Sequence, residues 1–434
     1  MRYTVGVDLG STTTKAVILD EQARVLGRGI TNSRSNYDVA CQVAMGEALN
    51  DTRFSMVRQS LLAGGLGEQE TTHLLKILDL RFKEQQYLDQ LRALRGTLEE
   101  HLEIQEASSG LKEAIASILD EMERKAGEFF REGASRKSDF FRDLAGSQYM
   151  ELAEDAAGAE GASFDQIVGY YDKAILVVEN LPPRGDTFRE HGRAVIASLP
   201  ERIPELEQAV LEAAEMELVQ AASVGTGYGR ARLPFPKASI RSEILCHGLG
   251  AHAMFPGTRT VLDIGGQDTK AIQVDAEGIV TSFQMNDRCA AGCGRYLGYI
   301  ADEMNLGLHE LGPLAQKSTR RVRINSTCTV FAGAELRERL SLGEKREDIL
   351  AGLHRAIILR AMSLLARSGG VSNEFTFTGG VANNPAAVKA LRDLIHENYG
   401  EITINISPQS IYTGALGAAL FAHRESLKVM KEAG

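Results

Sequence analysis

Asp8-Leu9-Gly10-Ser11-Thr12-Thr13-Thr14-Lys15 is the stretch on which the fold depends, and apolar runs at residues 3–9 and 16–19 adjoin it. Alternating apolar residues in such short runs predict two β-strands joined by a tight turn. Backbone N–H groups and hydroxyls in this turn can surround a phosphate, while the Asp carboxylate holds a hydrated Mg²⁺ ion. The same residues also suit a hairpin without a ligand. The predicted site residues are Asp8 as a catalytic group and Gly10, Ser11, Thr12, Thr13 and Lys15 as nucleotide-binding groups.

A second copy of this motif occurs later in the chain as Asp263-Ile264-Gly265-Gly266-Gln267-Asp268-Thr269-Lys270. It ends a β-branched and apolar run at residues 260–264 and precedes another predicted strand at residues 271–274. Two Asp-x-Gly hairpins that both end in Thr-Lys indicate a duplicated domain whose halves hold a triphosphate from opposite sides. Chance similarity between two hairpins is the alternative. The predicted site residues here are Asp263 as a catalytic group and Gly265, Gly266, Gln267 and Asp268 as nucleotide-binding groups.

A third glycine turn follows a short predicted strand and precedes the helix that begins at Pro385. Its glycines allow the backbone to approach a flat ligand such as adenine or ribose closely. Taken alone, this is an ordinary strand-to-helix turn. The residues predicted to bind adenosine are Gly379, Gly380 and Val381.

Three of the five cysteines lie close together, within two segments rich in small and polar residues. Cys289 and Cys328 are placed where helix N-termini would lower the thiol pKa and favour the thiolate that binds metal. An ordinary iron–sulfur site needs four thiolates, so these two would require two more from a second subunit. The alternative is that they are small buried hydrophobes. That interpretation is given to Cys41 and Cys246, and the role of Cys293 stays open.

Composition limits the classes of function. The 434 residues are enough for two or three domains, and 48 basic against 58 acidic residues give a net charge of −10 without a basic block. The first residues lead straight into a predicted strand, and no apolar run reaches the roughly 18–20 residues that cross a bilayer. Five cysteines, a sparse and odd set, argue against a disulfide framework. We therefore expect a cytoplasmic protein that binds neither nucleic acid nor membranes.

The three glycine turns together resemble the two phosphate motifs and the adenosine motif of the actin, sugar-kinase and heat-shock-chaperone ATPase superfamily. The resemblance implies a duplicated α/β ATPase fold that binds ATP and Mg²⁺. The segments around Cys289 and Cys328 are similar to those of the ATP-dependent electron activators. That family comprises the activator of 2-hydroxyacyl-CoA dehydratases and the ATP-binding subunits of benzoyl-CoA reductase. The resemblance covers residues 1–45 and 205–425, approximately.

The resemblance to electron activators implies a [4Fe-4S] cluster shared by two subunits, with Cys289 and Cys328 as the ligands from this chain. Cys293 departs from the family pattern, which more often has a threonine there. The second subunit would be a paralogous ATP-binding subunit or a second identical chain. Electrons would come from reduced ferredoxin and pass to substrate-reducing iron–sulfur subunits.

Glu243 lies in a predicted helix shortly before the second phosphate motif. Related ATPases place a carboxylate or an amide there that orients the attacking water, and the resemblance implies this role for Glu243. An exposed helix glutamate is the alternative.

Residues 46–205 lie outside the activator pattern and contain apolar residues at helical spacing among many charged ones. The predicted organisation is a first half of the ATPase domain at 1–45, a helical insertion at 46–205, and the remainder at 206–434 with the cluster-binding segments and the adenosine-binding part. The insertion is interpreted either as a self-packed helical lid or as a docking surface for partner subunits.

Within the family, an insertion of this size is similar to the larger ATP-binding subunit of benzoyl-CoA reductase. This resemblance favours an ATP-hydrolysing, electron-activating subunit of a ferredoxin-dependent benzoyl-CoA reductase. The alternatives are the activator ATPase of a 2-hydroxyacyl-CoA dehydratase and, in a different class, a sugar or acyl phosphotransferase with structural cysteines. A binding protein of the chaperone type is less well supported, because no β-sandwich pattern follows the ATPase region.

Overall fold

The computed structural model describes residues 1–33, 35–134, 138–158, 162–185, 187–199, 202–229, 233–286, 293–324 and 329–433. The chain forms two compact units. The helical unit contains Met1 and Arg34–Leu218, and the α/β unit contains Arg2–Ser33 and Val219–Gly434. Every residue predicted to bind the nucleotide belongs to the α/β unit.

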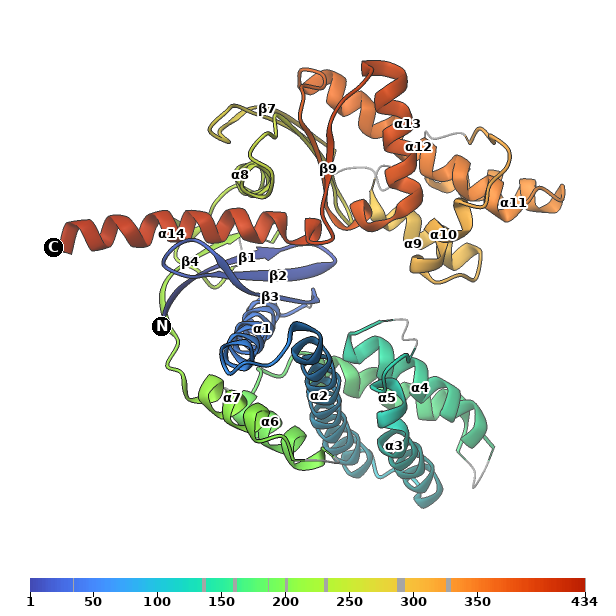
Figure 1. Cartoon of the computed structure of the whole chain (residues 1–434). Helices are drawn as coiled ribbons and strands as arrows, with labels where there is room; N and C mark the ends of the chain where they lie inside the picture. The colour runs from blue at the N-terminus through green and yellow to red at the C-terminus, as the bar shows by residue number, and fades with distance from the viewer. Residues whose placement is uncertain are drawn as a thin grey trace. The chain divides into compact units, whose positions relative to one another are not determined.

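The first sheet of the α/β unit has the strand order β3-β2-β1-β4 (Figure 1). Antiparallel pairs join β1, β2 and β3, whereas β4 lies parallel to β1. Helix α14 packs along this sheet and buries Val17 and Leu19 against Ala415 and Ala419. The elements are β1 (Arg2–Leu9), β2 (Thr13–Leu19), β3 (Val25–Asn32), β4 (Val219–Thr226) and α14 (Thr413–Ala433).

The second sheet repeats this pattern with the strand order β7-β6-β5-β8-β9. Its first three strands form an antiparallel meander, and β8 lies parallel to β5 as β4 lies parallel to β1. The predicted duplication is therefore confirmed in the strand order, with both Asp-x-Gly motifs at the turn of the first hairpin. The strands are β5 (Thr260–Ile264), β6 (Thr269–Val274), β7 (Val280–Asn286), β8 (Phe375–Thr378) and β9 (Ile404–Ile406).

Five helices build the main core of the α/β unit against the second sheet. The central one, α12, is long and apolar enough to cross a membrane, but most of it is buried in this core. The core helix of a soluble protein can have the same length and composition. It therefore gives only weak evidence for a membrane span. The helices are α9 (Gly294–Glu303), α10 (Leu308–Ala315), α11 (Thr329–Ser341), α12 (Arg346–Ser368) and α13 (Pro385–Tyr399).

Helices α8 (Glu243–Met254) and α14 cross at very close range. A β-carbon on Gly417 would lie 1.8 Å from the carbonyl oxygen of Cys246, and one on Gly250 would lie 2.1 Å from the carbonyl oxygen of Thr413. Glycine is needed at both positions because only a missing side chain lets the two backbones approach this closely. The crossing fixes α8 relative to the first sheet.

The described residues of the helical unit include two hydrophobic clusters. The larger one joins α2, α3, α4 and α5, and the smaller one joins α1, α2, α6 and α7. The ends of the predicted insertion, residues 46 and 205, fall inside α1 and α7. The helices are α1 (Tyr37–Ala63), α2 (Glu68–Ile104), α3 (Ser109–Phe129), α4 (Phe141–Ala156), α5 (Phe164–Glu179), α6 (Phe188–Ser198) and α7 (Pro204–Glu215).

Candidate nucleotide site

The first phosphate turn joins β1 to β2. Asp8 and Lys15 are paired across this hairpin, and the ammonium group of Lys15 folds back to within 3.0 Å of the position that a β-carbon on Gly10 would occupy. The Ser33 hydroxyl donates a hydrogen bond of 2.6 Å to the Gly10 carbonyl and holds the turn. A cation and a small-residue turn therefore lie together at the end of the first sheet, as a phosphate requires.

Asp8 is 5% exposed, yet its carboxylate forms no hydrogen bond or ion pair with the described residues. Two glycines crowd it. A β-carbon on Gly227, which has a φ of +104°, would lie 2.6 Å from Oδ1, and one on Gly414 would lie 2.7 Å from Oδ2. A buried carboxylate without a partner is costly, so Asp8 is a candidate ligand for a cation or its water.

The second phosphate turn joins β5 to β6 and has a different electrostatic setting. Asp263 is 1% exposed, and its Oδ1 accepts a hydrogen bond of 2.9 Å from the Thr378 hydroxyl. The ammonium group of Lys270 lies 3.4 Å from Oδ2 of Asp263 and 2.8 Å from Asp268. Burial acts to raise the pKa of Asp263, but His247 and Lys270 outweigh it and hold that pKa well below its usual range.

The two turns meet. A β-carbon on Gly266 would lie 2.2 Å from the hydroxyl of Thr12, so the second turn touches the first without a side chain between them. Asp268 closes its own turn, since the Gly265 amide donates a hydrogen bond of 3.0 Å to the Asp268 carbonyl. Predicted residues from both hairpins therefore share one location in the α/β unit.

Helix α8 adds two side chains to this location. Glu243 is its first residue and is buried, and His247 follows one turn later on the same face. Burial raises the pKa of Glu243 above its usual value, although Lys270 acts in the opposite direction. Nδ1 of His247 lies 3.2 Å from Oδ1 of Asp263. Burial acts to lower the pKa of His247, but Asp263 outweighs it and raises this pKa.

The predicted adenosine turn follows β8, beside the second phosphate turn. Thr378 is paired with Asp263 in the sheet. Gly379 has a φ of +85°, and a β-carbon there would lie 2.3 Å from the Ile264 carbonyl oxygen, so this position requires glycine. The turn continues into the short helix η4 (Gly380–Asn383), in which Val381 is buried.

Cys289 and Cys328 lie outside the described residues, and so the predicted cluster ligands have no geometry here. Among the residues that the structure does describe, no group of three His, Cys, Asp or Glu side chains could hold a metal ion. Helix α11 begins at Thr329, directly after Cys328 in the sequence. Cys41 and Cys246 are buried, and burial raises both thiol pKa values to about 12, as expected of small buried hydrophobes.

Helix α9 connects the second phosphate turn to the segment that contains Cys289. The amide of Gly294 donates a 2.8 Å hydrogen bond to the Gly265 carbonyl, and the amide of Arg295 donates one of 2.7 Å to Gly266. Cys293, which precedes them, is fully buried. The first turn of α9 is therefore hydrogen-bonded directly to the predicted nucleotide turn.

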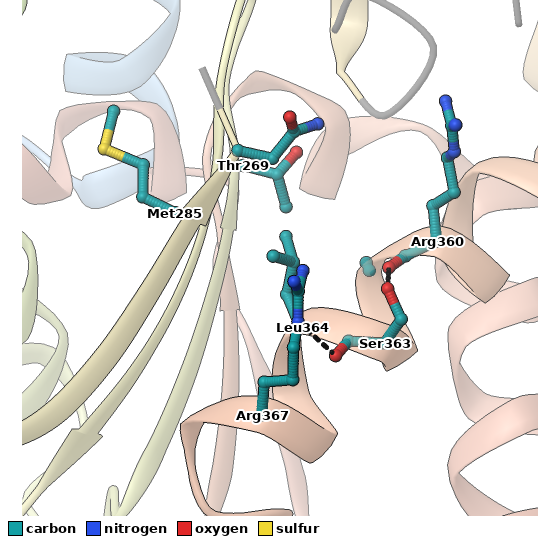
Figure 2. Close-up of a pocket in the computed structure, with 8 residues that line it drawn as sticks. Thr269, Met285, Arg360, Ser363, Leu364 and Arg367 are labelled. Carbon is teal, nitrogen blue, oxygen red and sulfur yellow. Dashed lines mark hydrogen bonds between the residues drawn. The ribbon is translucent and has the colours of Figure 1, made fainter. Parts of the chain in front are cut away.

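A cavity of about 300 Å³ lies between α12 and the ends of β6 and β7 (Figure 2). Figure 2 shows Arg360, Ser363 and Arg367 on α12, with Thr269 and Met285 on the strands. None of the predicted site residues is among the eight described residues that line it. Thr269, which belongs to the second phosphate motif, is the lining residue that comes nearest in sequence to the predicted site residues.

Three participants in the site were not predicted from the sequence: His247, Lys270 and Thr378. The available signal for His247 was its spacing of four residues from Glu243, which places both on one helical face. Lys270 and Thr378 occur in the predicted motifs, but only the strand register shows that they contact Asp263.

Comparisons with known proteins found relatives of this chain. A family model described as the BadF/BadG/BcrA/BcrD ATPase family matches residues 5–422. The (R)-2-hydroxyglutaryl-CoA dehydratase activating ATPase of Acidaminococcus fermentans is 44% identical over 220 residues, which are 50% of this chain and 82% of that protein. One of the benzoyl-CoA reductase subunits of Thauera aromatica is 32% identical over 216 residues, 50% of this chain and 74% of that one.

A solved structure gives the same fold. It is the activator of the 2-hydroxyisocaproyl-CoA dehydratase from Clostridium difficile with bound ADPNP, which has a TM-score of 0.56 and 23% sequence identity to this chain. The similarity covers 99% of this chain and 97% of that one. The predicted duplicated α/β ATPase fold is thus confirmed.

Proposed function

Because this chain belongs to the BadF/BadG/BcrA/BcrD ATPase family, whose members include activator ATPases, we propose that it is the ATP-hydrolysing activator of a 2-hydroxyacyl-CoA dehydratase. The activator would use ATP to deliver single low-potential electrons to its partner enzyme. The observation that carries this proposal is the 44% identity to a dehydratase activating ATPase over most of that protein's length. Identity to the benzoyl-CoA reductase protein is lower, at 32%.

The interpretation that favours benzoyl-CoA reductase depends on the helical insertion alone. The sequence comparisons support the dehydratase activator better, since identity is 44% to the dehydratase activating ATPase and 32% to the benzoyl-CoA reductase protein. The insertion then serves as a lid or as a surface for the partner enzyme.

Hydrolysis of ATP requires positioning and neutralisation of charge more than covalent chemistry. The hairpin turns would supply backbone amides around the phosphates, and Lys15 would supply positive charge. Lys270 is paired with Asp263 and Asp268. Glu243, buried at the start of α8, would hold the attacking water. The glycines at 379 and 380 let the backbone lie against adenosine.

A Mg²⁺ ion suits this set of residues, because the Asp8 carboxylate is buried without a partner among the described residues and offers hard oxygen ligands. Asp8 would hold the ion or its waters, with Asp263 nearby. The ion, when bound, neutralises the charge of the phosphates. Asp263 holds the side chains of Lys270 and His247 through ion pairs.

An iron–sulfur cluster suits two thiols per chain. In the sequence, Cys328 directly precedes α11 and Cys289 lies five residues before the start of α9. Cys289 and Cys328 would hold a [4Fe-4S] cluster together with two cysteines of a second subunit, either an identical chain or a paralogue. The cluster would supply one-electron transfer at low potential. The α9 junction at Gly265 and Gly266 would transmit the nucleotide state to the segment that carries Cys289. Reduced ferredoxin is the proposed donor, and the cytoplasm is the proposed location.

Electron transfer to a partner enzyme tests the function directly. The chain, purified without oxygen, is mixed with ATP, a low-potential reductant and a purified 2-hydroxyacyl-CoA dehydratase, and formation of the enoyl-CoA product is followed. The expected result is dehydration that requires ATP and is lost in Asp8→Asn, while iron content stays unchanged. ATP-dependent reduction of benzoyl-CoA by reductase subunits, without any dehydratase activation, would favour the other branch of the family. Phosphorylation of a sugar or acyl substrate by a colourless protein would contradict both.

A further inference from the structure

His247 lies in the candidate site without a part in the chemistry assigned above. Its side chain is 9% exposed, and Nδ1 lies 3.2 Å from Oδ1 of Asp263. The Asp263 carboxylate belongs to the second sheet, since it lies on β5. One nitrogen of the imidazole is therefore within ion-pair distance of a carboxylate of the second sheet, although no described residue forms a hydrogen bond with it.

The other ring nitrogen faces Asp8 on β1, in the first sheet. Nε2 of His247 lies 2.8 Å, and Oδ2 of Asp8 lies 2.7 Å, from the point where a β-carbon on Gly414 would be. Neither atom forms a hydrogen bond with another described residue. Two buried polar groups therefore face the same space, and this space exists because residue 414 is glycine.

An imidazole can contact two groups at once, one through each nitrogen, and the partner of Nδ1 fixes the direction in which Nε2 points. Carboxylates that bind a metal ion are themselves held by neighbouring groups, and loss of such a neighbour lowers the affinity for the metal ion. In this chain the two candidate carboxylates belong to different sheets. A group that contacts both would therefore fix the position of one carboxylate relative to the other.

Building on the proposed ATPase function, we propose that His247 is a positioning residue for the two carboxylates of the candidate Mg²⁺ site. Nδ1 contacts Asp263, and Nε2 contacts Asp8 across the space that a side chain at Gly414 would fill. Its effect is on the arrangement of these carboxylates, and through them on the binding of Mg²⁺ with the nucleotide. ATP itself is held by the turns and does not depend on His247.

The test uses the full chain with His247→Ala and measures two quantities. The first is the Mg²⁺ concentration that half-saturates binding of a fluorescent ATP analogue, and the second is the steady-state kcat and KM for ATP. We expect the Mg²⁺ requirement to rise about tenfold and kcat to fall roughly 10–100-fold. Binding of the analogue in excess EDTA and KM for ATP should stay close to wild type.

Two conservative variants separate the contacts of the two nitrogens. The amide of His247→Asn can replace Nδ1, and the longer amide of His247→Gln can replace Nε2. If His247 joins both carboxylates, each variant recovers only part of the Mg²⁺ affinity. Complete recovery by His247→Asn would overturn the proposal, because contact with Asp263 would then suffice.

Gly414→Ala provides a test in which residue 247 remains histidine. The added β-carbon fills the space between Nε2 and Asp8, so it should raise the Mg²⁺ requirement as His247→Ala does. Gly298→Ala is the matched control, since a β-carbon there meets no atom within 4 Å, and His252→Asn on the same helix α8 is the second control.

An unchanged Mg²⁺ requirement in both His247→Ala and Gly414→Ala would overturn the inference and leave the ATPase assignment intact. A wild-type chain that binds no ATP would instead overturn the proposed function.

Discussion

At the scale of single residues, the site is a cluster of buried charges that depend on one another. Lys270 is 3% exposed and lies between Asp263 and Asp268, and Glu243 is close enough to influence it. Burial acts to lower the pKa of Lys270, but these carboxylates outweigh it and raise that pKa, so the side chain stays charged. Such a cluster is stable only while its charges balance.

Replacing Lys270 with methionine should therefore be far more damaging than removing a surface lysine. Asp263 would remain buried, and Asp268 partly buried, without this cation, which costs about 3–5 kcal/mol of unfolding free energy. Lys389→Met is the matched control, because Lys389 is exposed and its pair with Asp393 contributes at most about 0.5 kcal/mol. Urea unfolding monitored by circular dichroism measures both. Equal losses in the two variants would show that Lys270 is not part of a balanced buried cluster.

His354, on α12, should make the stability depend on pH. It is 1% exposed, Nδ1 donates a 2.7 Å hydrogen bond to the Leu350 carbonyl, and burial lowers the pKa to about 4. The folded state keeps this imidazole neutral, whereas the unfolded chain binds a proton near the ordinary pKa of 6.5. Stability should thus fall by roughly 3 kcal/mol as the pH decreases from 6.5 to 4.

The variant His354→Met cannot bind this proton, so it should lose this part of the pH dependence in unfolding experiments between pH 4 and 7. The exposed His396 serves as the control, since His396→Gln should leave the slope as it is. A wild-type slope in His354→Met would contradict the assignment.

The two carboxylates of the candidate site were predicted from the sequence, but the neighbours that contact them were not. Asp8 and Asp263 could be predicted because each ends a strand beside a glycine turn, and this local pattern is visible in the chain. His247 could not be predicted in the same way, because its contact with Asp263 and its place near Asp8 arise from the packing of α8 against α14 and the second sheet. Interactions between distant segments leave no local pattern.

At the scale of elements, α9 is the part through which the proposed nucleotide site would act on the cysteine segment. Its first two amides bond to Gly265 and Gly266, and a β-carbon on Gly294 would lie 3.1 Å from the Gly265 oxygen and 3.4 Å from Val381. One glycine thus touches both the second phosphate turn and the adenosine turn. A shift in either turn would move the start of α9.

Gly294→Ala should disturb this junction without unfolding the protein. The added carbon is tight against both turns, and a displacement of a few tenths of an ångström should weaken ATP binding by roughly 3–10-fold, or about 1 kcal/mol. Alanine also favours the helix itself, so the melting temperature should not fall substantially. Gly298→Ala, in the same helix but in open space, is the control. Isothermal titration with ATP measures both, and wild-type affinity in Gly294→Ala would contradict a tight junction.

The elements themselves could be predicted to different degrees. The two hairpins could be predicted because alternation of apolar residues and glycine turns are local patterns. The helical spacing of apolar residues predicted helices in residues 74–130, and the structure has α2 and α3 there. The parallel pairing of β4 with β1, and of β8 with β5, could not be derived from local pattern, because long segments separate the paired strands.

At the scale of the whole molecule, an ATPase unit of known family is interrupted by a unit made of helices. The ATPase unit contains the nucleotide turns, the hydrogen-bonded start of α9 and the segments that lead to Cys289 and Cys328. The proposed function therefore depends on one claim. It is that Cys289 and Cys328, together with two cysteines of a second subunit, hold a cluster that responds to the nucleotide.

Iron content and mass, measured together on the chain purified without oxygen, test this claim most directly. The account predicts a brown dimer with about two irons per chain, and loss of the iron but not of ATP binding in Cys328→Ser, whereas Cys41→Ser keeps its iron. A colourless wild-type protein, or a Cys328→Ser variant with its full complement of iron, would contradict it.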